Sequence, residues 1–395
     1  MEGEGDSVFK ALVEEKNLMA IAVVMLLSLF SGLVVKLAIN GSAETQPELI
    51  AAISSWLKVW LELTVAGILM GFVYFLLSAG MTIVFGLMGV FNLAHGAFIA
   101  TATFVFIHII YKVNSLTRIT ETRMVSPLPG VIEPSEKLFI KSEGWFYDGS
   151  AFTTILIIFI GVVIVSAVIG MIAFVYERYI VRLVYGNTTL QMLITLGGAV
   201  VLIELLMTTY GARTPGLRKP ALLFGHLQFL EFWDGGVGVL RTRILGGAIG
   251  MVVFVITYLV LMKTKVGILI RAGVENKEML EAQGYNIKRL FVLVFIFANI
   301  IAAIGGSVYS LNGVSMTTDV SNELLLIVIA AIMIGGVGSV KGCLVGSVLI
   351  ALVHNYMSAI YPPLSGQVSV VMVMLAVLLW QPRGLNPLES NGEQL

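Results

Sequence analysis

Long apolar runs alternate with short polar links along most of this chain. A helix needs about 20 apolar residues to cross a bilayer core about 30 Å thick. Eight runs approach or exceed that length, at residues 18–39, 57–88, 91–111, 153–176, 189–210, 245–262, 291–311 and 343–360, and shorter runs occupy 324–334 and 368–380. The pattern therefore predicts about ten transmembrane helices. Because the run at 57–88 is too long for one perpendicular crossing, we expect its helix to tilt, kink or break near its end.

Polar segments divide the chain into three parts. Residues 1–56 are predicted to form an N-terminal tail and one additional transmembrane helix, residues 57–385 the main membrane domain, and residues 386–395 a C-terminal tail. The N-terminal segment is acidic, unlike the basic start of a signal peptide, so we expect the first span to be retained.

Three long polar segments interrupt the membrane domain. The stretches 112–150 and 211–242 contain several prolines and are predicted to be extramembrane loops without long helices. The third, at 263–290, reads KTKVGILIRAGVENKEMLEAQGYNIKRL and carries nine charged residues between two apolar spans. Each charge would cost roughly 2.5 to 3.5 kcal/mol at a helix centre in the bilayer, so this charged island must lie outside the hydrocarbon core.

The residues of the charged island favour a short amphipathic helix at 276–283, ended by Gly284 as its C-cap. Alternation of the spans places the island on one side with the link at 177–188, the turn at Lys341 and both termini. Basic residues divide equally between the two sides, so total charge does not assign them. The basic density of the island favours the cytoplasm.

Composition agrees with an all-α polytopic integral membrane protein. Hydrophobic residues make up 58% of the 395 residues and charged residues only 12%, against about 25% charged in soluble domains. Acidic and basic residues are equal in number, which gives no basic surface for nucleic acid. Cys343 is the single cysteine, and the sequence has no metal-ligand spacing and no nucleophile–base pattern. We expect no catalytic residue, no metal and no cofactor.

Glycines at a spacing of four predict close helix packing within the membrane. Gly67 and Gly71 form one such pair, and Gly338, Gly342 and Gly346 form a second set. The second set begins in GGVGSVKG, which lacks the residue order of a nucleotide-binding loop.

Few polar residues interrupt the apolar runs. Asn92 and His95 share a helix face, and Gly96 permits close packing or a local break. This group is predicted to be either a structural turn or part of a substrate path. Glu204 lies past the middle of its span, where a carboxylate has to be paired, protonated or hydrated, and it fits path lining and helix packing equally well.

Three stretches carry a resemblance to a known family. AGMTIVFGLMGVFNLAHGAF, the island followed by an apolar span, and IVIAAIMIGGVGSVKGCLVGSVLIALV occur in the order seen in permease subunits of branched-chain amino acid type ABC importers, which also include urea and amide importers. QPRGL near the end is similar to the usual end of that family. The resemblance covers about residues 60–385 and is strongest to the first permease of the pair.

The resemblance implies a bacterial-type inner membrane location and a set of partners. Such permeases pair with a second permease subunit, identical or homologous, bind two separate ATP-hydrolysing subunits, and receive the solute from an extracytoplasmic binding protein. Glu281, Ala282 and Gly284 resemble a shortened form of the loop by which ABC permeases dock on the ATPase. The residues assigned to this coupling role are Glu278, Met279, Leu280, Glu281, Ala282, Gly284 and Tyr285, with Met279, Leu280 and Tyr285 as its apolar contacts.

The chain also departs from the family pattern. Ala97 stands where an acidic residue usually follows His-Gly, which puts a carboxylate-dependent role of that turn in doubt. The two proline-containing loops are longer than usual. Three alternatives stay open: an ion-coupled secondary transporter, which needs ion sites at membrane depth; an integral membrane enzyme; and an island that is only a solvated loop.

Overall fold

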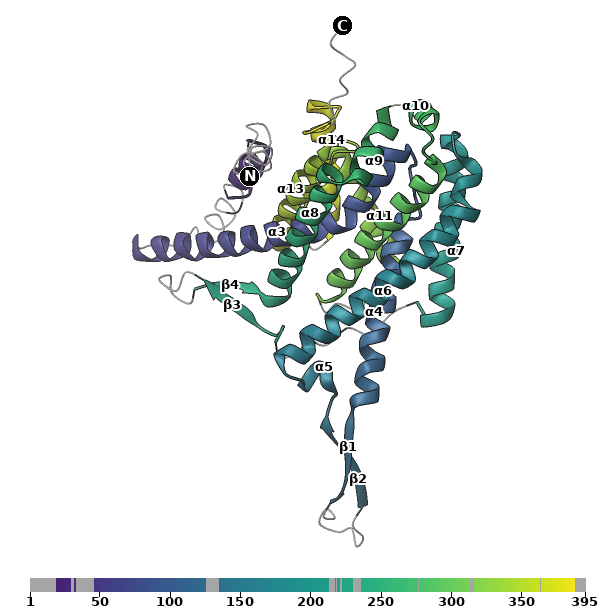
Figure 1. Ribbon diagram of the computed structural model, residues 1–395. Coiled ribbons are helices and arrows are strands. Elements are labelled where there is room, and N and C mark those ends of the chain that lie inside the picture. Colours follow the sequence, from purple (N-terminus) through teal and green to yellow (C-terminus); the bar gives the residue numbers. More distant parts are fainter. Residues whose placement is uncertain are drawn as a thin grey trace.

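The computed structural model describes residues 19–29, 32, 46–125, 135–212, 217, 219–220, 222–229, 236–275, 277–312, 316–362 and 364–387. Within this part of the chain, seven helices are long and apolar enough to cross a membrane. They are α3 (Gln46–Met88), α4 (His95–Thr117), α6 (Ala151–Tyr179), α7 (Thr188–Tyr210), α8 (Arg241–Lys263), α11 (Ile287–Ser310) and α13 (Val340–Ile360). Two shorter apolar helices, α12 (Val320–Gly335) and α14 (Leu364–Trp380), lie beside them (Figure 1). The predicted all-helical polytopic fold is confirmed, with the count of ten approximate.

The predicted span at 18–39 lies partly outside the described residues. Its described part is a helix at Met19–Leu29 that contacts the start of α3. Trp60 Nε1 donates to Ser28 Oγ at 3.1 Å, and Trp56 Nε1 donates to the Leu29 carbonyl at 3.3 Å. These bonds attach the N-terminal helix to the membrane domain.

Helix α3 is the centre of the bundle. It packs against α13, α11, α8 and α12. Its membrane-spanning window is 72% buried within the chain, whereas the window of α7 is only 22% buried. The helix runs unbroken for 43 residues, so of the tilt, kink or break that its length predicts, a break is absent. At about 1.5 Å per residue it is roughly twice as long as the bilayer core is thick, and its first part extends sideways from the bundle (Figure 1).

Glycines allow the backbones of α3 and its neighbours to approach. A Cβ added at Gly71 would lie 2.6 Å from Val348 Cα in α13, and one at Gly67 would lie 3.2 Å from Leu352 Cα. On the opposite side, a Cβ at Gly250 of α8 would lie 2.6 Å from the Phe72 carbonyl oxygen. Close backbone contact of this kind holds helices together in lipid, where burial of apolar side chains supplies little driving force.

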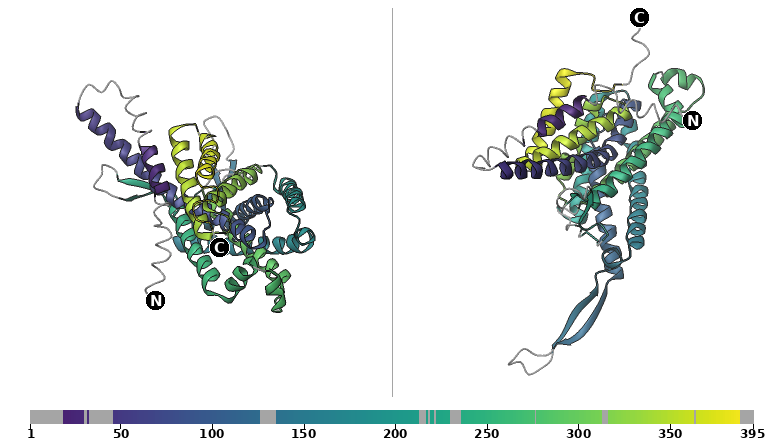
Figure 2. Two further views of the ribbon diagram at one scale, coloured as in Figure 1. Left: turned by 90° about the horizontal axis from the view of Figure 1, so that it is seen from above. Right: turned by 90° about the vertical axis from the view of Figure 1, so that its left-hand side faces the viewer.

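Two antiparallel hairpins lie in the segments 112–150 and 211–242, for which the sequence predicts extramembrane loops without long helices. The first pairs β1 (Ile119–Val125) with β2 (Ser135–Ser142) and is followed by the one-turn helix α5 (Trp145–Asp148). The second pairs β3 (His226–Phe229) with β4 (Val237–Leu240). Both hairpins lie at the end of the bundle opposite the charged island (Figures 1 and 2). The prolines that favoured a loop at 112–150 fall between the two strands, outside the described residues.

The described C-terminal residues return to α12. The amide of Leu385 donates to the Ile334 carbonyl at 2.8 Å, and that of Asn386 donates to the Gly335 carbonyl at 3.0 Å. These bonds satisfy carbonyls at the end of α12 that have no partner within the helix. Residues 388–395 of the predicted tail lie outside the described part.

Gly80 offers a test of the close approach between α3 and α11. A Cβ there would meet the Ala298 carbonyl and lie 3.1 Å from His95 Cε1. Because backbone cannot move away as a flexible side chain can, we expect Gly80→Ala to destabilise the protein by about 1–3 kcal/mol. A lower Tm of the purified protein in detergent would report this.

Gly197→Ala is the matched control, because nothing lies within 4 Å of a Cβ at Gly197 in α7. Replacing a helical glycine there is expected to leave stability unchanged or to raise it by up to about 1 kcal/mol. Equal Tm values for the two variants would contradict the close packing of α3 on α11.

Candidate functional site

The charged island folds into two helices at one end of the bundle. α9 (Lys265–Glu275) follows α8 after the single residue Thr264, whose Oγ1 accepts from the Gly267 amide at 3.2 Å and so caps α9. α10 (Lys277–Ala282) follows α9 and leads into α11. The prediction of one short helix is therefore incomplete, since α9 precedes it.

The turn from α10 to α11 is specified by three residues. Gly284 has a φ of +86°, a backbone conformation that favours glycine. Its amide donates to the Glu281 carbonyl at 2.9 Å, and the Tyr285 amide donates to the Leu280 carbonyl at 3.2 Å. This pair of bonds is a Schellman motif. Asn286 then caps α11, its Oδ1 accepting from the Arg289 amide at 3.1 Å.

Exposure separates the residues assigned to coupling. Met279 is 60% and Tyr285 48% exposed, and Glu281, Ala282 and Gly284 are also exposed. We call these five residues the docking face. Leu280 is only 3% exposed, so the expectation that it contacts a partner is wrong. Its side chain packs toward α9, where a Cβ at Gly273 would lie 3.5 Å from Leu280 Cδ2. The side chain of Glu278 lies outside the described residues.

Asn92 and His95 occupy a buried turn between α3 and α4. Asn92 Oδ1 accepts from the Ala94 amide at 3.1 Å, and His95 Nε2 lies 2.9 Å from the Leu77 carbonyl oxygen. Thr195 of α7 joins them, since its Oγ1 accepts from the Leu93 amide at 3.2 Å. The turn thus ties α3, α4 and α7 together. These contacts are those of a helix junction, and a place for these residues in the substrate path stays a prediction.

Gly96 is packed against another helix, whereas Glu204 is exposed. A Cβ at Gly96 would meet the Ser321 carbonyl and lie 2.8 Å from Leu325 Cβ, so Gly96 sits in close contact with α12. Glu204 is exposed on the outer face of α7 beside Leu205. Within the described residues its carboxylate makes no hydrogen bond or ion pair, so any partner has to come from outside this part of the chain.

The N-cap of α13 separates Gly338 from the other two glycines of the predicted set, Gly342 and Gly346. Ser339 Oγ accepts from the Gly342 amide at 3.1 Å and begins α13. Gly338 therefore precedes the helix, with a φ of +79°, and the prediction that it shares a helix face with Gly342 and Gly346 is wrong. A Cβ at Gly342 would meet the Gly335 carbonyl and one at Gly346 the Ala331 carbonyl, so both glycines lie against α12.

Isolated polar residues in the apolar helices mostly bond to their own backbone, as expected for such residues. Thr82 donates to the Ser78 carbonyl at 3.0 Å, Asn299 to the Phe295 carbonyl at 2.8 Å, and Ser307 to the Ala303 carbonyl at 2.8 Å. Among the described residues, no group of three or more His, Cys, Asp and Glu residues could hold a metal ion. Thr82, Asn299 and Ser307 are thus each bonded within their own helix.

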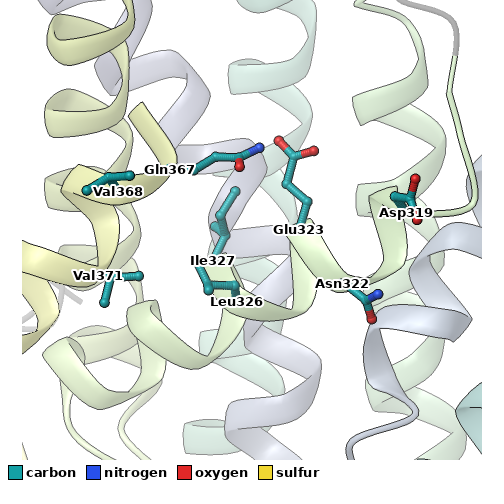
Figure 3. Close-up of a pocket in the computed structure, with 8 residues that line it drawn as sticks. All are labelled: Asp319, Asn322, Glu323, Leu326, Ile327, Gln367, Val368 and Val371. Carbon is teal, nitrogen blue, oxygen red and sulfur yellow. The ribbon is translucent and has the colours of Figure 1, made fainter. Parts of the chain in front are cut away.

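A second polar region, which the sequence did not single out, lies toward the hairpin end of the bundle. A pocket of about 450 Å³ opens between α12 and α14, with Asp319, Asn322, Glu323 and Gln367 beside Leu326, Ile327, Val368 and Val371 (Figure 3). Toward the same end of the bundle, Arg243 Nη1 donates to Asn355 Oδ1 at 3.3 Å, and the rings of Tyr74 and His354 pack edge to face with centroids 6.2 Å apart. Arg243 and Glu323 stand at the ends of apolar runs, where the sequence pattern resembles that of loop residues.

The fold and these features define a multi-pass membrane protein in which a small helical element, α9 and α10, lies outside the long apolar helices. Residues 63–378 match the family described as the permease component of the branched-chain amino acid transport system, and this chain belongs to that family.

Individual relatives are distant in sequence but similar in extent. The chain is 22% identical over 334 residues to the high-affinity branched-chain amino acid transport system permease protein BraD of Pseudomonas aeruginosa, covering 82% of this chain and 95% of BraD. It is 21% identical over 330 residues to the corresponding LivH protein of Escherichia coli K12, covering 81% of this chain and 92% of LivH. A search of the solved structures found no match.

The turn at His95 yields a paired prediction with Ser78. His95→Ala removes the side-chain bond that joins the start of α4 to the Leu77 carbonyl of α3, so we expect a loss of about 1–3 kcal/mol and lower transport. Ser78 Oγ is buried and has no hydrogen-bond partner among the described residues, so Ser78→Ala is expected to change stability little. Tm and uptake measured on both variants test this. The junction has no structural role if His95→Ala behaves like Ser78→Ala.

Proposed function

We propose that this chain is the permease subunit of an ATP-driven importer for a small polar or aliphatic solute, such as a branched-chain amino acid, an amide or urea. It would work in the inner membrane of a bacterial-type cell with a second permease, identical or homologous, and with two ATP-hydrolysing subunits. An extracytoplasmic binding protein would deliver the solute. The permease itself would catalyse no covalent reaction.

The docking face on α10 is the observation that carries this proposal. It combines two large apolar side chains, Met279 and Tyr285, with the acidic Glu281 on a compact helical projection. Apolar groups of this size, exposed together outside the membrane, are typical of a protein contact. The printed names of the relatives, which are transport permeases, support the same assignment.

The short link between α10 and α11 would allow a movement of α10 to be transmitted to a membrane-spanning helix. Only Gln283, Gly284, Tyr285 and Asn286 separate α10 from α11, and both helix ends at this turn are capped. α11 in turn packs against α3, α4 and α6. Displacement of the docking face by a partner would therefore move α11 as a unit, which alternating access requires.

Substitution on the docking face tests the partner. We expect Glu281→Arg to remove most co-purification with the ATPase subunits, because it reverses a charge on the contact surface. Gly284→Pro should have the same effect by breaking the turn, since proline cannot adopt a φ of +86°. Both variants are expected to insert and to keep the Tm of the membrane bundle.

Lys265→Glu is the control, because it reverses an exposed charge on α9 in the same island but outside the docking face. It is expected to co-purify with the ATPase as the wild type does. Normal coupled transport in both Glu281→Arg and Gly284→Pro would contradict the docking assignment.

Uptake by proteoliposomes separates the proposed importer from an ion-coupled transporter. We expect uptake only when the ATPase subunits, the binding protein and ATP are all present. Uptake by the permease alone, driven by an ion gradient, would reject the proposal.

A further inference from the structure

A buried polar link joins α6 to the segment that leads into α7. Glu177, in the last turn of α6, is 0% exposed. The short 3₁₀ helix η1 (Val181–Val184) follows α6, and the hydroxyl of the next residue, Tyr185, donates to Glu177 Oε1. η1 packs against both α6 and α7. We call residues 177–187 the elbow, and the Glu177–Tyr185 bond closes it.

The elbow lies against the start of α11, the helix that follows the docking face. The Tyr185 ring packs edge to face on Phe291 of α11, with ring centroids 5.5 Å apart. One turn further along α11, Phe295 stacks on Tyr176 of α6, with ring centroids 6.3 Å apart. Phe291 and Phe295 are spaced (i, i+4) and therefore share one face of α11. This face meets both the elbow and the end of α6.

Packing does not explain an acidic residue at position 177. Glu177 Oε2 is buried and has no hydrogen-bond partner among the described residues. A buried acceptor without a partner destabilises the folded chain, and a well-packed apolar side chain would avoid that cost. What the carboxyl group supplies, and an apolar group cannot, is the directed bond to Tyr185. This bond fixes the position of the elbow relative to α6.

α7 lies at the edge of the bundle, and it packs mainly against α4 and η1 (Figures 1 and 2). We propose that Glu177 and Tyr185 are positioning residues that hold the elbow against Phe291, so that displacement of the docking face moves α7 together with α11. The inference rests on the proposed import function, in which the ATP-hydrolysing subunits displace that face. Without the Glu177–Tyr185 bond, α11 would slide past the elbow and leave α7 in place.

Coupled transport in proteoliposomes tests this inference on the complete complex, with the ATPase subunits and the binding protein present. Uptake of radiolabelled leucine and release of phosphate from ATP are followed in the same vesicles, and their ratio gives the solute imported per ATP hydrolysed. Tyr185→Phe removes the hydroxyl and keeps the ring on Phe291. We expect this variant to lower the ratio about threefold or more, because movement of α11 no longer reaches α7. Its Tm and its co-purification with the ATPase should stay as in the wild type.

Two variants of Glu177 and a matched tyrosine complete the test. Glu177→Leu lacks the acceptor and should lower the ratio as much as Tyr185→Phe does. Glu177→Gln keeps a side-chain oxygen that can accept from the Tyr185 hydroxyl, so it is expected to retain most of the wild-type ratio. Tyr179→Phe is the control, because Tyr179 is 64% exposed at the end of the same helix. The control should behave as the wild type.

The outcomes separate coupling from stability and from the import function itself. A wild-type ratio in both Tyr185→Phe and Glu177→Leu would overturn the inference. Equal losses of uptake and ATP hydrolysis, accompanied by a lower Tm, would also overturn it, because they indicate a bond that only stabilises the fold. Uptake by the wild type without ATP would reject the import function, and this result is obtained before any variant is made.

Discussion

Close approach of helix backbones is the constraint on which this structure depends. In a bilayer an apolar side chain gains little by exchanging lipid for protein, so helices associate through tight contact and through the bonds of the few polar groups. α3 meets this requirement on several sides at once, through Gly67 and Gly71 against α13 and through Gly80 against α11. The neighbouring helices α13 and α11 therefore assemble by packing on α3, and this packing buries α3.

The same constraint explains where polar groups occur. Residues such as Thr82 and Ser307 return their hydrogen bonds to the preceding helical turn and cost little in an apolar bundle. Arg243 and Glu323 differ, because no such local bond neutralises a charge. Both stand in the first turn of their helices, toward the hairpin end of the bundle, where a charge is less costly than at the centre of a span.

Much of the fold could be predicted from the sequence. A helix that crosses a bilayer needs a minimum length and an apolar composition, and both can be read directly from the order of the residues. The helix stop at Gly284 was also readable, since glycine frequently adopts a positive φ at a helix end. Three features could not be read from the sequence. The β1–β2 hairpin lies in a polar, proline-containing segment whose pattern is weak. The burial of Leu280 depends on its packing against α9, and the pocket between α12 and α14 is assembled from residues of two separate helices.

The bonds from Leu385 and Asn386 to the end of α12 set an order for biosynthesis. These amides belong to residues synthesised about 50 positions after the carbonyls that accept them. The last turn of α12 therefore waits, incompletely bonded, while α13 and α14 emerge from the ribosome and insert. This part of the protein can close only after residues 385 and 386 have been synthesised, so a chain that stops just short of QPRGL would lack the bonds that complete an internal helix.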